Sequence, residues 1–454
     1  MPLASETRVA EALYEDRVNP QWVKLLNVLQ MNVRYSHCAG PELFTQEGRR
    51  ILDFLSGYCV YNAGHNHPAI IEAIKDELDR HGPGMLQSHV PELAGELAAS
   101  LCSRAGGRFE KAFFASSGSE GVEAAIKFSR AHTKRAGLLY AEGAFHGLTC
   151  GALSLMGDPF WREGFGPLLP ETEAVPFNDL RTLERKLATK KFAAYVVEPI
   201  QSEAGIRLPD AGYFEKVGGL CRRHGTLLVL DEVQTGLHRT GPFLAGHHYN
   251  ADPDMVVLAK ALSGGLVPAA AVLMTDEVFS STYGSFKRAI VHTSTFSENS
   301  LSMRAGLATL EVLDREGLAE QSRARGEYLR QRLRAALAGY EMVAAVRGMG
   351  LLNGIEFQAP RGLRLRVPFG AFMAIHKGMF GQVLVMRLFR DHGMLTQICG
   401  NNFMVLKVAP PLVIDEAQID EFVQAVTAVV DLMHNSTAFW TEALGLAGRV
   451  LHNI

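Results

Sequence analysis

Two charged residues follow apolar runs, where either could carry unusual chemistry. Asp231 ends the run GTLLVL and begins DEVQTGLHRTG, and Lys260 ends DMVVLA in front of ALSGG. A lysine among apolar neighbours has a lowered pKa and can form a Schiff base with a carbonyl compound. A carboxylate at the end of a buried strand needs a cationic partner, such as a protonated pyridine nitrogen. Each residue alone also fits an ordinary role, as a capping aspartate or a solvated lysine.

A serine- and glycine-rich turn offers a place for an anion. The residues Ser116-Ser117-Gly118-Ser119-Glu120 follow the run KAFFA and open the helical segment GVEAAIKFSR. Backbone N–H groups, hydroxyls and the positive end of a helix suit a phosphate group. Plain capping of the helix by Ser119, with Glu120 or Glu123 in the first turn, explains the same residues.

Two further segments could complete such a site. Phe145, in Phe145-His146-Gly147, follows GLLYAE and could stack on a planar ligand, although core packing is the commoner role of such a residue. The hydroxyl-rich loop HTSTF, from His292 to Phe296, could add phosphate ligands, or its hydroxyls could satisfy their own backbone.

The elements that must position these residues alternate along the chain. Apolar runs (KAFFA, GLLYA, AAYVV, TLLVL, MVVLA and AAAVLM) alternate with helical segments between about residues 68 and 310. This order predicts an α/β domain with a mainly parallel sheet. Ligands bind at the carboxyl ends of such strands, and Glu198, Asp231 and Lys260 all fall there. From Ser300 to Tyr340 the sequence predicts one long helix. Hairpins are predicted around Gln46-Glu47-Gly48 and within VRGMGLLNGIEF.

Composition narrows the classes of function. The 454 residues are 47% hydrophobic and 20% charged, and the net charge of -3 gives no reason to expect nucleic acid as a partner. The six cysteines form no CxxC pair, so we expect no metal site. We expect the thiols to be reduced. The N-terminus MPLASETRVAEALYEDR lacks the pattern of a signal peptide, and the apolar runs are too short to span a bilayer. These features predict a cytoplasmic protein.

Together, the segments resemble the class III, ornithine/acetylornithine-type aminotransferases that depend on pyridoxal 5′-phosphate. The resemblance runs from about Glu42 to Val413, through FLSGYCVYNAGHNHP, SSGSEGVEAAIK, FHG, EPIQSEAG, DEVQTGLHRTG, LAKALSGG, HTSTF and VRGMGLL. It implies the fold type I architecture, with a seven-stranded sheet in a large domain (residues 68–310). A small α+β domain would combine residues 311–454 with the N-terminal segment 1–67.

The resemblance also implies roles for the site residues. Lys260 would form the Schiff base and move the substrate proton, and Asp231 would bind the pyridine nitrogen. Val233 would pack under the ring, Phe145 would stack on its other face, and Gln234 would approach the ring hydroxyl. Thr295 would complete the phosphate site of the neighbouring subunit, which implies a homodimer. The remaining members of the expected cofactor set are Gly118, Ser119, His146 and Glu198.

The substrate half of the site departs from the family pattern. Leu148 stands where ornithine-type members have a carboxylate-binding arginine, and Lys407 stands where they have a second one. A leucine cannot donate a hydrogen bond, and a lysine attracts a carboxylate only as a point charge. Glu203 keeps the position of the family's gating glutamate, and Tyr58 is expected beside the substrate. We therefore expect glutamate as amino donor and a large apolar aldehyde or ketone, such as a hopanoid aldehyde, as acceptor. An ornithine or acetylornithine aminotransferase and an aminomutase remain alternatives.

Two apolar segments near the C-terminus have more than one interpretation each. Phenylalanines and methionines between residues 369 and 389 could form the core of the small domain, a hydrophobic substrate channel or a membrane-facing patch. The terminal segment STAFWTEALGLAGRVLHNI has Phe439, Leu444, Leu446 and Val450 at helical spacing, and could lie on a membrane surface or dock on its own domain.

Overall fold

A seven-stranded sheet forms the centre of the larger lobe in the computed structural model, which describes residues 12–86, 88–375 and 377–451. The strand order is β4-β10-β9-β8-β7-β5-β6, and all strands are parallel except β10, which runs antiparallel to β4 and β9. The predicted α/β class and the mainly parallel sheet are thus confirmed. The strands are β4 (Lys111–Ala115), β5 (Gly137–Ala141), β6 (Thr172–Val175), β7 (Phe192–Val197), β8 (Leu227–Asp231), β9 (Met255–Leu258) and β10 (Ala270–Met274).

The central strands are continuous in apolar residues because helices cover both faces of the sheet. Every residue of β7, β8, β9 and β10 is buried. Helix α6 (Gly118–Thr133) packs on β7, β9 and β10, while α9 (Tyr213–His224) packs on β8 and α5 (Glu92–Ala105) on β4. The edge strand β6 was not predicted, because the strand TEAV is short and most of its residues are only half-buried.

The second lobe holds two four-stranded sheets, of order β1-β2-β3-β13 and β11-β12-β15-β14. Both predicted hairpins are confirmed, β2 with β3 and β11 with β12. The parallel pairing of β13 with β3 brings the N-terminal strands to the C-terminal part of the chain, although the domain boundaries at residues 67 and 310 stay a prediction. The strands are β1 (Tyr35–Ala39), β2 (Glu42–Thr45), β3 (Arg50–Asp53), β11 (Val343–Met349), β12 (Leu352–Phe357), β13 (Met394–Leu395), β14 (Gln397–Cys399) and β15 (Asn402–Val408).

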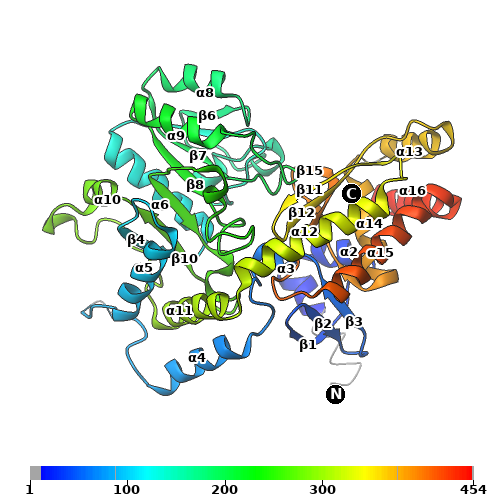
Figure 1. Ribbon diagram of the computed structural model, residues 1–454, viewed down its shortest axis with the longest axis horizontal. Helices are drawn as coiled ribbons and strands as arrows, with labels where there is room; N and C mark the ends of the chain where they lie inside the picture. Colours follow the sequence, from blue (N-terminus) through cyan, green and yellow to red (C-terminus); the bar gives the residue numbers. More distant parts are fainter. Residues whose placement is uncertain (1–11, 87, 376, 452–454) are drawn as a thin grey trace.

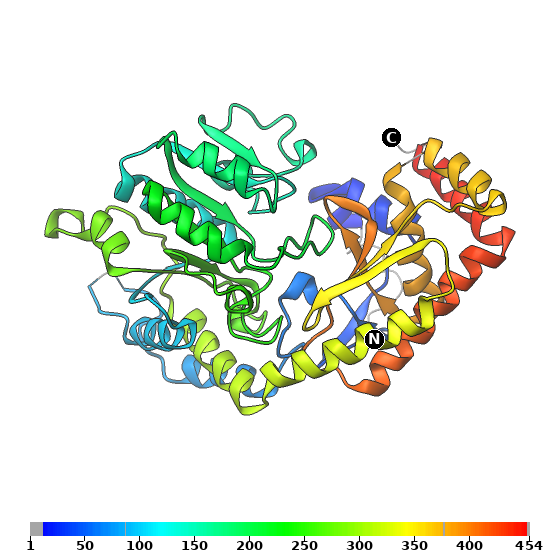
Figure 2. The same ribbon diagram turned by 45° about the horizontal axis from the view of Figure 1, so that its top comes forward.

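The prediction of one long helix between Ser300 and Tyr340 was wrong. The segment forms two helices, α11 (Ser300–Arg315) and α12 (Leu318–Leu337), which meet at Gly317. Gly317 has φ +61°, a left-handed conformation that ends α11 and that glycine adopts without a steric cost. Figure 2 shows the two helices running from the larger lobe along the smaller one.

The Phe- and Met-rich segment is core, so the substrate-channel and membrane-patch interpretations of it were wrong. It forms α13 (Leu363–Ile375) and α14 (Phe380–His392), and its large side chains pack together in the small lobe (Phe369, Phe372, Met379, Phe380 and Met386 buried, Met373 half-buried). Among the described residues no single helix is long and apolar enough to span a membrane; α13 and α14 reach that length only as a pair, across a bend of 104°.

The terminal helix α16 (Thr437–Leu451) docks on its own lobe, against α13, α14 and α15. Phe439 and Leu446 are buried and Leu444 is half-buried, so the apolar stripe faces the protein rather than a membrane. The side chain of Val450 lies outside the described residues. All six cysteines are free, as expected.

The remaining helices complete the two lobes. The α-helices are α2 (Pro20–Val28), α3 (Ser56–Cys59), α4 (Pro68–Asp79), α7 (Cys150–Leu153), α8 (Leu180–Leu187), α10 (Asp276–Tyr283) and α15 (Glu416–Asn435). The short 3-10 helices are η1 (Pro159–Trp161), η2 (Ala245–Tyr249), η3 (Lys260–Ser263), η4 (Phe286–Arg288) and η5 (Lys377–Met379).

Candidate active site

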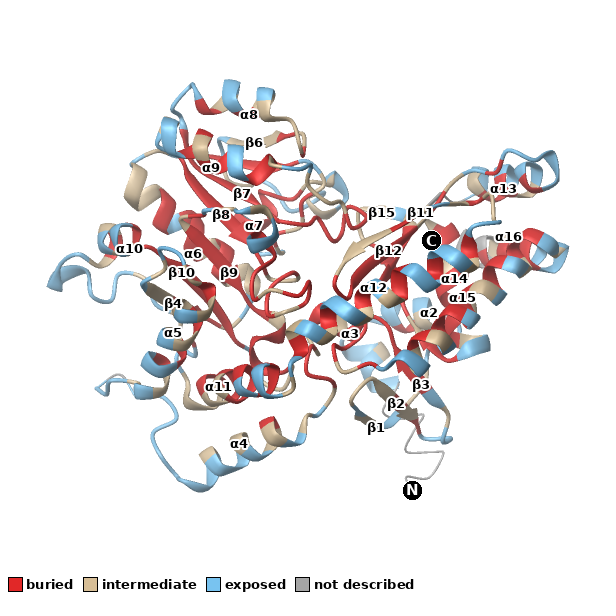
Figure 3. Ribbon diagram, in the orientation of Figure 1, coloured by how far each residue is buried: buried red, intermediate tan, exposed pale blue. Residues whose placement is uncertain are grey.

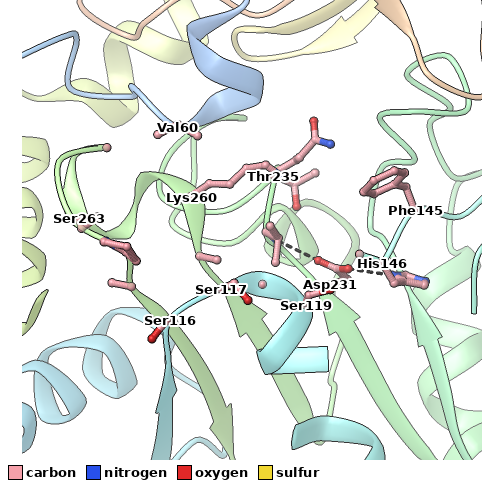
Figure 4. Close-up of a pocket in the computed structure, with 18 of the residues that line it drawn as sticks. Val60, Ser116, Ser117, Ser119, Phe145, His146, Asp231, Thr235, Lys260 and Ser263 are labelled. Atoms are coloured by element: carbon pink, nitrogen blue, oxygen red, sulfur yellow. Dashed lines mark hydrogen bonds and ion pairs between the residues drawn. The ribbon is translucent and has the colours of Figure 1, made fainter. Parts of the chain in front are cut away.

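A cavity of about 500 Å³ lies at the carboxyl ends of the parallel strands. It is lined by residues that follow β4, β5, β7, β8 and β9, the elements that the sequence predicted would meet there. Figure 4 shows Lys260, Asp231 and Phe145 around this space, with Ser117 and Ser119 along one side. The predicted site residues that line it are Gly118, Ser119, Phe145, His146, Glu198, Asp231, Val233, Gln234 and Lys260.

Asp231 is buried at the end of β8, with His146 as its partner. His146 Nδ1 lies 2.7 Å from Asp231 Oδ2, and the Val233 N–H donates to Oδ1 at 3.0 Å. Both side chains are almost completely buried. Because two groups already hold the carboxylate in place, it can present a fixed negative charge to a cationic ring nitrogen in the cavity.

Lys260 begins the 3-10 helix η3, directly after β9 and Ala259. Its φ of 48° is a left-handed conformation that costs energy for a non-glycine residue and that occurs often at functional sites. Burial lowers the pKa of Lys260 below its ordinary 10.5, and the negative charge of Asp231 opposes this effect. The lysine therefore gives up its proton more readily than a solvated one, as a Schiff-base nucleophile requires.

Glu198 is a buried carboxyl whose protonated form is favoured. Burial raises the pKa of its carboxyl well above 4.5, and the nearby Asp231 and Glu203 raise it further. The Phe145 N–H donates to its Oε1 at 3.4 Å. A neutral carboxyl carries one proton that it can donate to a ligand oxygen.

The serine-rich turn differs from the prediction in one respect. Ser117, not Ser119, caps α6, since its Oγ accepts from the Glu120 N–H at 3.2 Å. Ser119 instead accepts from the N–H groups of Leu148 and Thr149 at 2.9 and 3.2 Å. Ser119 cannot cap the helix because α6 begins at Gly118, so Ser119 already lies inside it.

Two glycines make room around this turn. A Cβ on Gly147, whose φ is +114°, would lie 2.1 Å from Ser119 Oγ, and a Cβ on Gly118 would lie 2.9 Å from the Val233 side chain. The backbone of the turn can therefore approach a ligand closely at the first turn of a 16-residue helix, where a phosphate is favoured.

The cavity fits pyridoxal 5′-phosphate. Four residues that line it each have a buried polar atom without a hydrogen-bond partner among the described residues: His146 Nε2, Glu198 Oε2, Ser202 Oγ and Gln234 Oε1. Buried polar atoms in proteins are normally hydrogen-bonded, so these atoms indicate a polar ligand. Ser117, Gly118 and Ser119 would hold its phosphate, Asp231 its ring nitrogen, and Lys260 its carbonyl carbon.

The expected substrate residues lie beside the cavity rather than in its lining. Lys407 and Glu203 form a buried ion pair, and Glu203 also accepts from Gln234 Nε2 at 2.9 Å and from the Gly400 N–H at 2.8 Å. Burial opposes ionisation of Glu203, but Lys407 and the two hydrogen bonds lower its pKa to about 2. The pKa of Lys407 is raised, because Glu203 outweighs the effect of burial. The Lys407 ammonium lies 5.2 Å from the centre of the Tyr58 ring.

Leu148 and Thr295 lie at the surface. The Leu148 side chain is 54% exposed, on the loop whose backbone binds Ser119. Thr295 is exposed and lines a separate surface hollow with Met85, Leu86 and Ile290. Thr295 therefore cannot contribute to the cofactor cavity of its own chain.

Three residues that support the site were not predicted. Arg239 is fully buried and donates to Ser56 Oγ, Asn62 Oδ1 and the carbonyls of Leu351 and Pro410. Ser56 and Asn62 lie on either side of Tyr58, and Pro410 follows the strand that contains Lys407. Arg239 therefore connects the segment of Tyr58 to the end of that strand. Trp161 and Asn401 meet across the two lobes, with Trp161 Nε1 donating to Asn401 Oδ1 at 2.8 Å. The position of Arg239 within LHRTG, close to Asp231, was a usable signal, whereas Trp161 and Asn401 had none.

Comparison with known proteins agrees with this geometry. The family profile described as Aminotransferase class-III matches residues 26–430. Aminotransferase PigE of Serratia sp. is 35% identical over 92% of the chain, but the chain spans only 53% of that protein. Putrescine aminotransferase of Pectobacterium atrosepticum is 35% identical, with 89% of the chain and 85% of that protein covered. The structure of ornithine aminotransferase from Toxoplasma gondii superposes with a TM-score of 0.79 at 26% identity and covers 93% of this chain and 98% of that one. The chain therefore belongs to the class-III aminotransferases, a family whose members use pyridoxal 5′-phosphate.

Proposed function

We propose that the chain transfers an amino group from glutamate to an aldehyde or ketone with a large apolar body, of which a hopanoid aldehyde is one example. The observation that carries this proposal is the pair of changes at the substrate end. The Leu148 side chain offers no hydrogen-bond donor, and Lys407 forms the buried ion pair with Glu203. The site can then bind one carboxylate-bearing substrate through Lys407 and otherwise favours apolar groups.

The residues of the cavity have distinct tasks in this reaction. Pyridoxal 5′-phosphate, when bound, supplies a carbonyl that carries the amino group and a ring that accepts electrons. Lys260 Nζ would take the proton from the carbon that bears the donor's amino group and would hold it beside the reacting atoms for its return. Asp231, held by His146, keeps a negative charge at the ring nitrogen. Phe145, half-buried in the cavity lining, excludes water from one face.

The Glu203–Lys407 pair would distinguish the two substrates. With glutamate bound, Lys407 would form an ion pair with the carboxylate of glutamate in place of Glu203. With an apolar acceptor bound, Lys407 and Glu203 would stay paired, and neither charge would face the apolar group. A relative named as a putrescine aminotransferase supports this view, since putrescine is an amine without a carboxylate.

A panel of amines tests the proposed function. The purified enzyme in its pyridoxal 5′-phosphate form is mixed with glutamate, ornithine, N-acetylornithine and long-chain alkylamines, and the absorbance of the bound cofactor is followed. We expect fast conversion by glutamate and alkylamines and slow conversion by ornithine and N-acetylornithine. The reverse order would favour an ornithine-type enzyme, and an isomerised product formed without an acceptor would favour an aminomutase. In Lys407→Ala, the Michaelis constant for glutamate should rise at least tenfold; an unchanged value would contradict the carboxylate role of Lys407.

We further propose a homodimer in which Thr295 completes the partner's phosphate site. Support comes from the exposed apolar side chains that line the same surface hollow as Thr295, where Met85 is 44%, Leu86 58% and Ile290 82% exposed. Such a contiguous surface is typical of a protein interface.

Mixed dimers test this arrangement. Lys260→Ala and Thr295→Ala subunits, each weakly active alone, are co-expressed with different affinity tags and purified as the mixed species. One of the two sites then has both residues, so about half of the wild-type activity should return. No recovery in a verified mixed dimer would place Thr295 outside the partner's site.

A further inference from the structure

Three aromatic rings lead from the cofactor cavity to the surface. Phe145 lines the cavity, and its ring centre lies 5.4 Å from that of Trp161 at an interplanar angle of 89°. Trp161 in turn lies 5.3 Å from Phe160, at 79°. We refer to Phe145, Trp161 and Phe160 as the aromatic row. Their edge-to-face contacts make it continuous, from a residue inside the site to one in solvent.

Trp161 is held at the centre of this row from both lobes. Asn401, in the turn between β14 and β15, accepts from Trp161 Nε1 and donates to the Gly143 carbonyl at 3.0 Å. Its backbone N–H donates to the Glu203 carbonyl at 2.9 Å. Asn401 therefore joins Trp161 to the loop that carries Phe145 through its side chain, and to the segment that carries Glu203 through its backbone.

The loop that carries the row is itself fixed against the Phe145 loop. Gly157 N–H donates to the Ala144 carbonyl at 2.8 Å, and a Cβ on Gly157 would lie 2.3 Å from the backbone nitrogens of Gly143 and Ala144. Asp158 caps the short helix η1 by accepting from the Phe160 N–H at 2.9 Å. The aromatic rings are thus presented on a rigid support rather than on a loose loop.

Exposure increases along the row. Phe145 and Trp161 are half-buried, and Phe160 is 71% exposed. Leu148, at 54% exposed, follows Phe145 closely in the chain and adds another apolar side chain on the cavity loop. A rigid row of rings that begins in a catalytic cavity and ends in solvent is suited to bind a ligand that extends out of that cavity.

We infer that the aromatic row is the binding site for the apolar chain of the amino acceptor, which runs from the cofactor over Trp161 to Phe160. The inference rests on the proposed function and deepens it by assigning the residues that select the substrate. Continuity with the cavity through Phe145 identifies the occupant as a part of the substrate, and the rings pack against aliphatic or polycyclic hydrocarbon. Phe145 touches the reacting part, and Trp161 and Phe160 determine specificity.

The test is a series of straight-chain amines, from n-propylamine to n-decylamine, converted by the pyridoxal 5′-phosphate enzyme. Each methylene that the row removes from water should raise kcat/KM about two- to fourfold, until the chain passes Phe160. In Phe160→Ser the increase should stop at a shorter chain length than in the native enzyme. In Trp161→Ala the increase should be lost for all but the shortest amines.

Matched variants separate this role from a structural one. Phe165→Ser removes another exposed ring of the same loop, 66% exposed and without a ring contact to the row among the described residues, and should leave the chain-length dependence unchanged. Trp161→Phe keeps a ring but loses the hydrogen bond to Asn401, and should retain most of the dependence. Calorimetric titration with unreactive n-alkanols should give the same dependence on chain length without turnover.

The outcomes distinguish the inference from the proposed function. If short amines react but kcat/KM is independent of chain length, or if Phe165→Ser and Phe160→Ser behave alike, the aromatic row does not bind the substrate while the aminotransferase remains. If no amine reacts at all, the proposed function fails and the inference fails with it.

Discussion

Replacement of Lys407 by methionine should reverse the pH dependence of stability. In the native protein, burial disfavours the charged form of Glu203, but Lys407, Gln234 and Gly400 together hold its pKa at about 2, against an ordinary value of 4.5. This difference corresponds to about 3 kcal/mol of stabilisation. The pKa is lowered by folding, so the contribution is complete above about pH 4.5 and is lost as the pH falls through about 2.

Without Lys407, the buried Glu203 carboxylate has lost its cation and retains two hydrogen bonds. We expect the free energy of unfolding at pH 7 to fall by about 3 to 5 kcal/mol, as for other buried pairs broken on one side. The pKa of Glu203 then rises, so Lys407→Met should lose stability as the pH rises through the new value, which is the opposite sign to the native pair.

Urea unfolding followed by tryptophan fluorescence, at about pH 5 and about pH 8, measures both effects. The double variant Glu203→Gln/Lys407→Met has no buried charge and should recover most of the loss, while Lys407→Arg keeps the charge and should lose less than Lys407→Met. A Lys407→Met protein within about 1 kcal/mol of the native one at both pH values would refute the reasoning.

Three further predictions concern the cofactor half of the site. Glu198→Gln should bind pyridoxal 5′-phosphate within about threefold of the native affinity, because burial and the nearby carboxylates favour the protonated form of Glu198, whereas Glu198→Ala should bind it at least tenfold more weakly; fluorescence titration measures both. Gly118→Ala should weaken cofactor binding at least tenfold in the same titration, since its Cβ would lie 2.9 Å from Val233, and native affinity would show that Val233 can move. The rate of cofactor capture by the apoenzyme should rise with pH through an apparent pKa below 10.5. In Asp231→Asn this apparent pKa should fall further, because Asp231 raises the pKa of Lys260; a rise measured by stopped-flow absorbance would contradict this.

Strands and helices could be predicted where a short run of consecutive residues is enough to identify them. The buried strands that end at Asp231 and before Lys260 are apolar in every residue, and a strand of that kind fits only a sheet covered on both faces. Local signals failed where one residue decides the outcome. Gly317 divides the expected long helix into two, and Ser117 rather than Ser119 caps α6, because the first helical residue, Gly118, lies two positions earlier than a Ser119 cap would require.

Contacts between distant segments could not be predicted from the sequence. The pairing of His146 with Asp231 joins residues 85 positions apart, and that of Trp161 with Asn401 joins residues 240 positions apart. The role of the Phe- and Met-rich segment could not be predicted either, since the same apolar residues can line a channel or fill a core. Only the helices packed around α14 decide that Phe372 and Phe380 are core.

Arg239 has a consequence for how the protein can be divided. Its guanidinium is fully buried, burial lowers its pKa, and its acceptors belong to three stretches of chain, around Ser56–Asn62, at Leu351 and at Pro410. A fragment that lacks any of these stretches would lose those hydrogen bonds and expose the surface that packs around Arg239. We therefore expect a lobe expressed alone to be less stable than the whole chain, and a split enzyme to assemble best from pieces that together restore every acceptor. The same requirement means that natural or engineered exchange of lobes between relatives succeeds only when the segments around Arg239 are exchanged as a set.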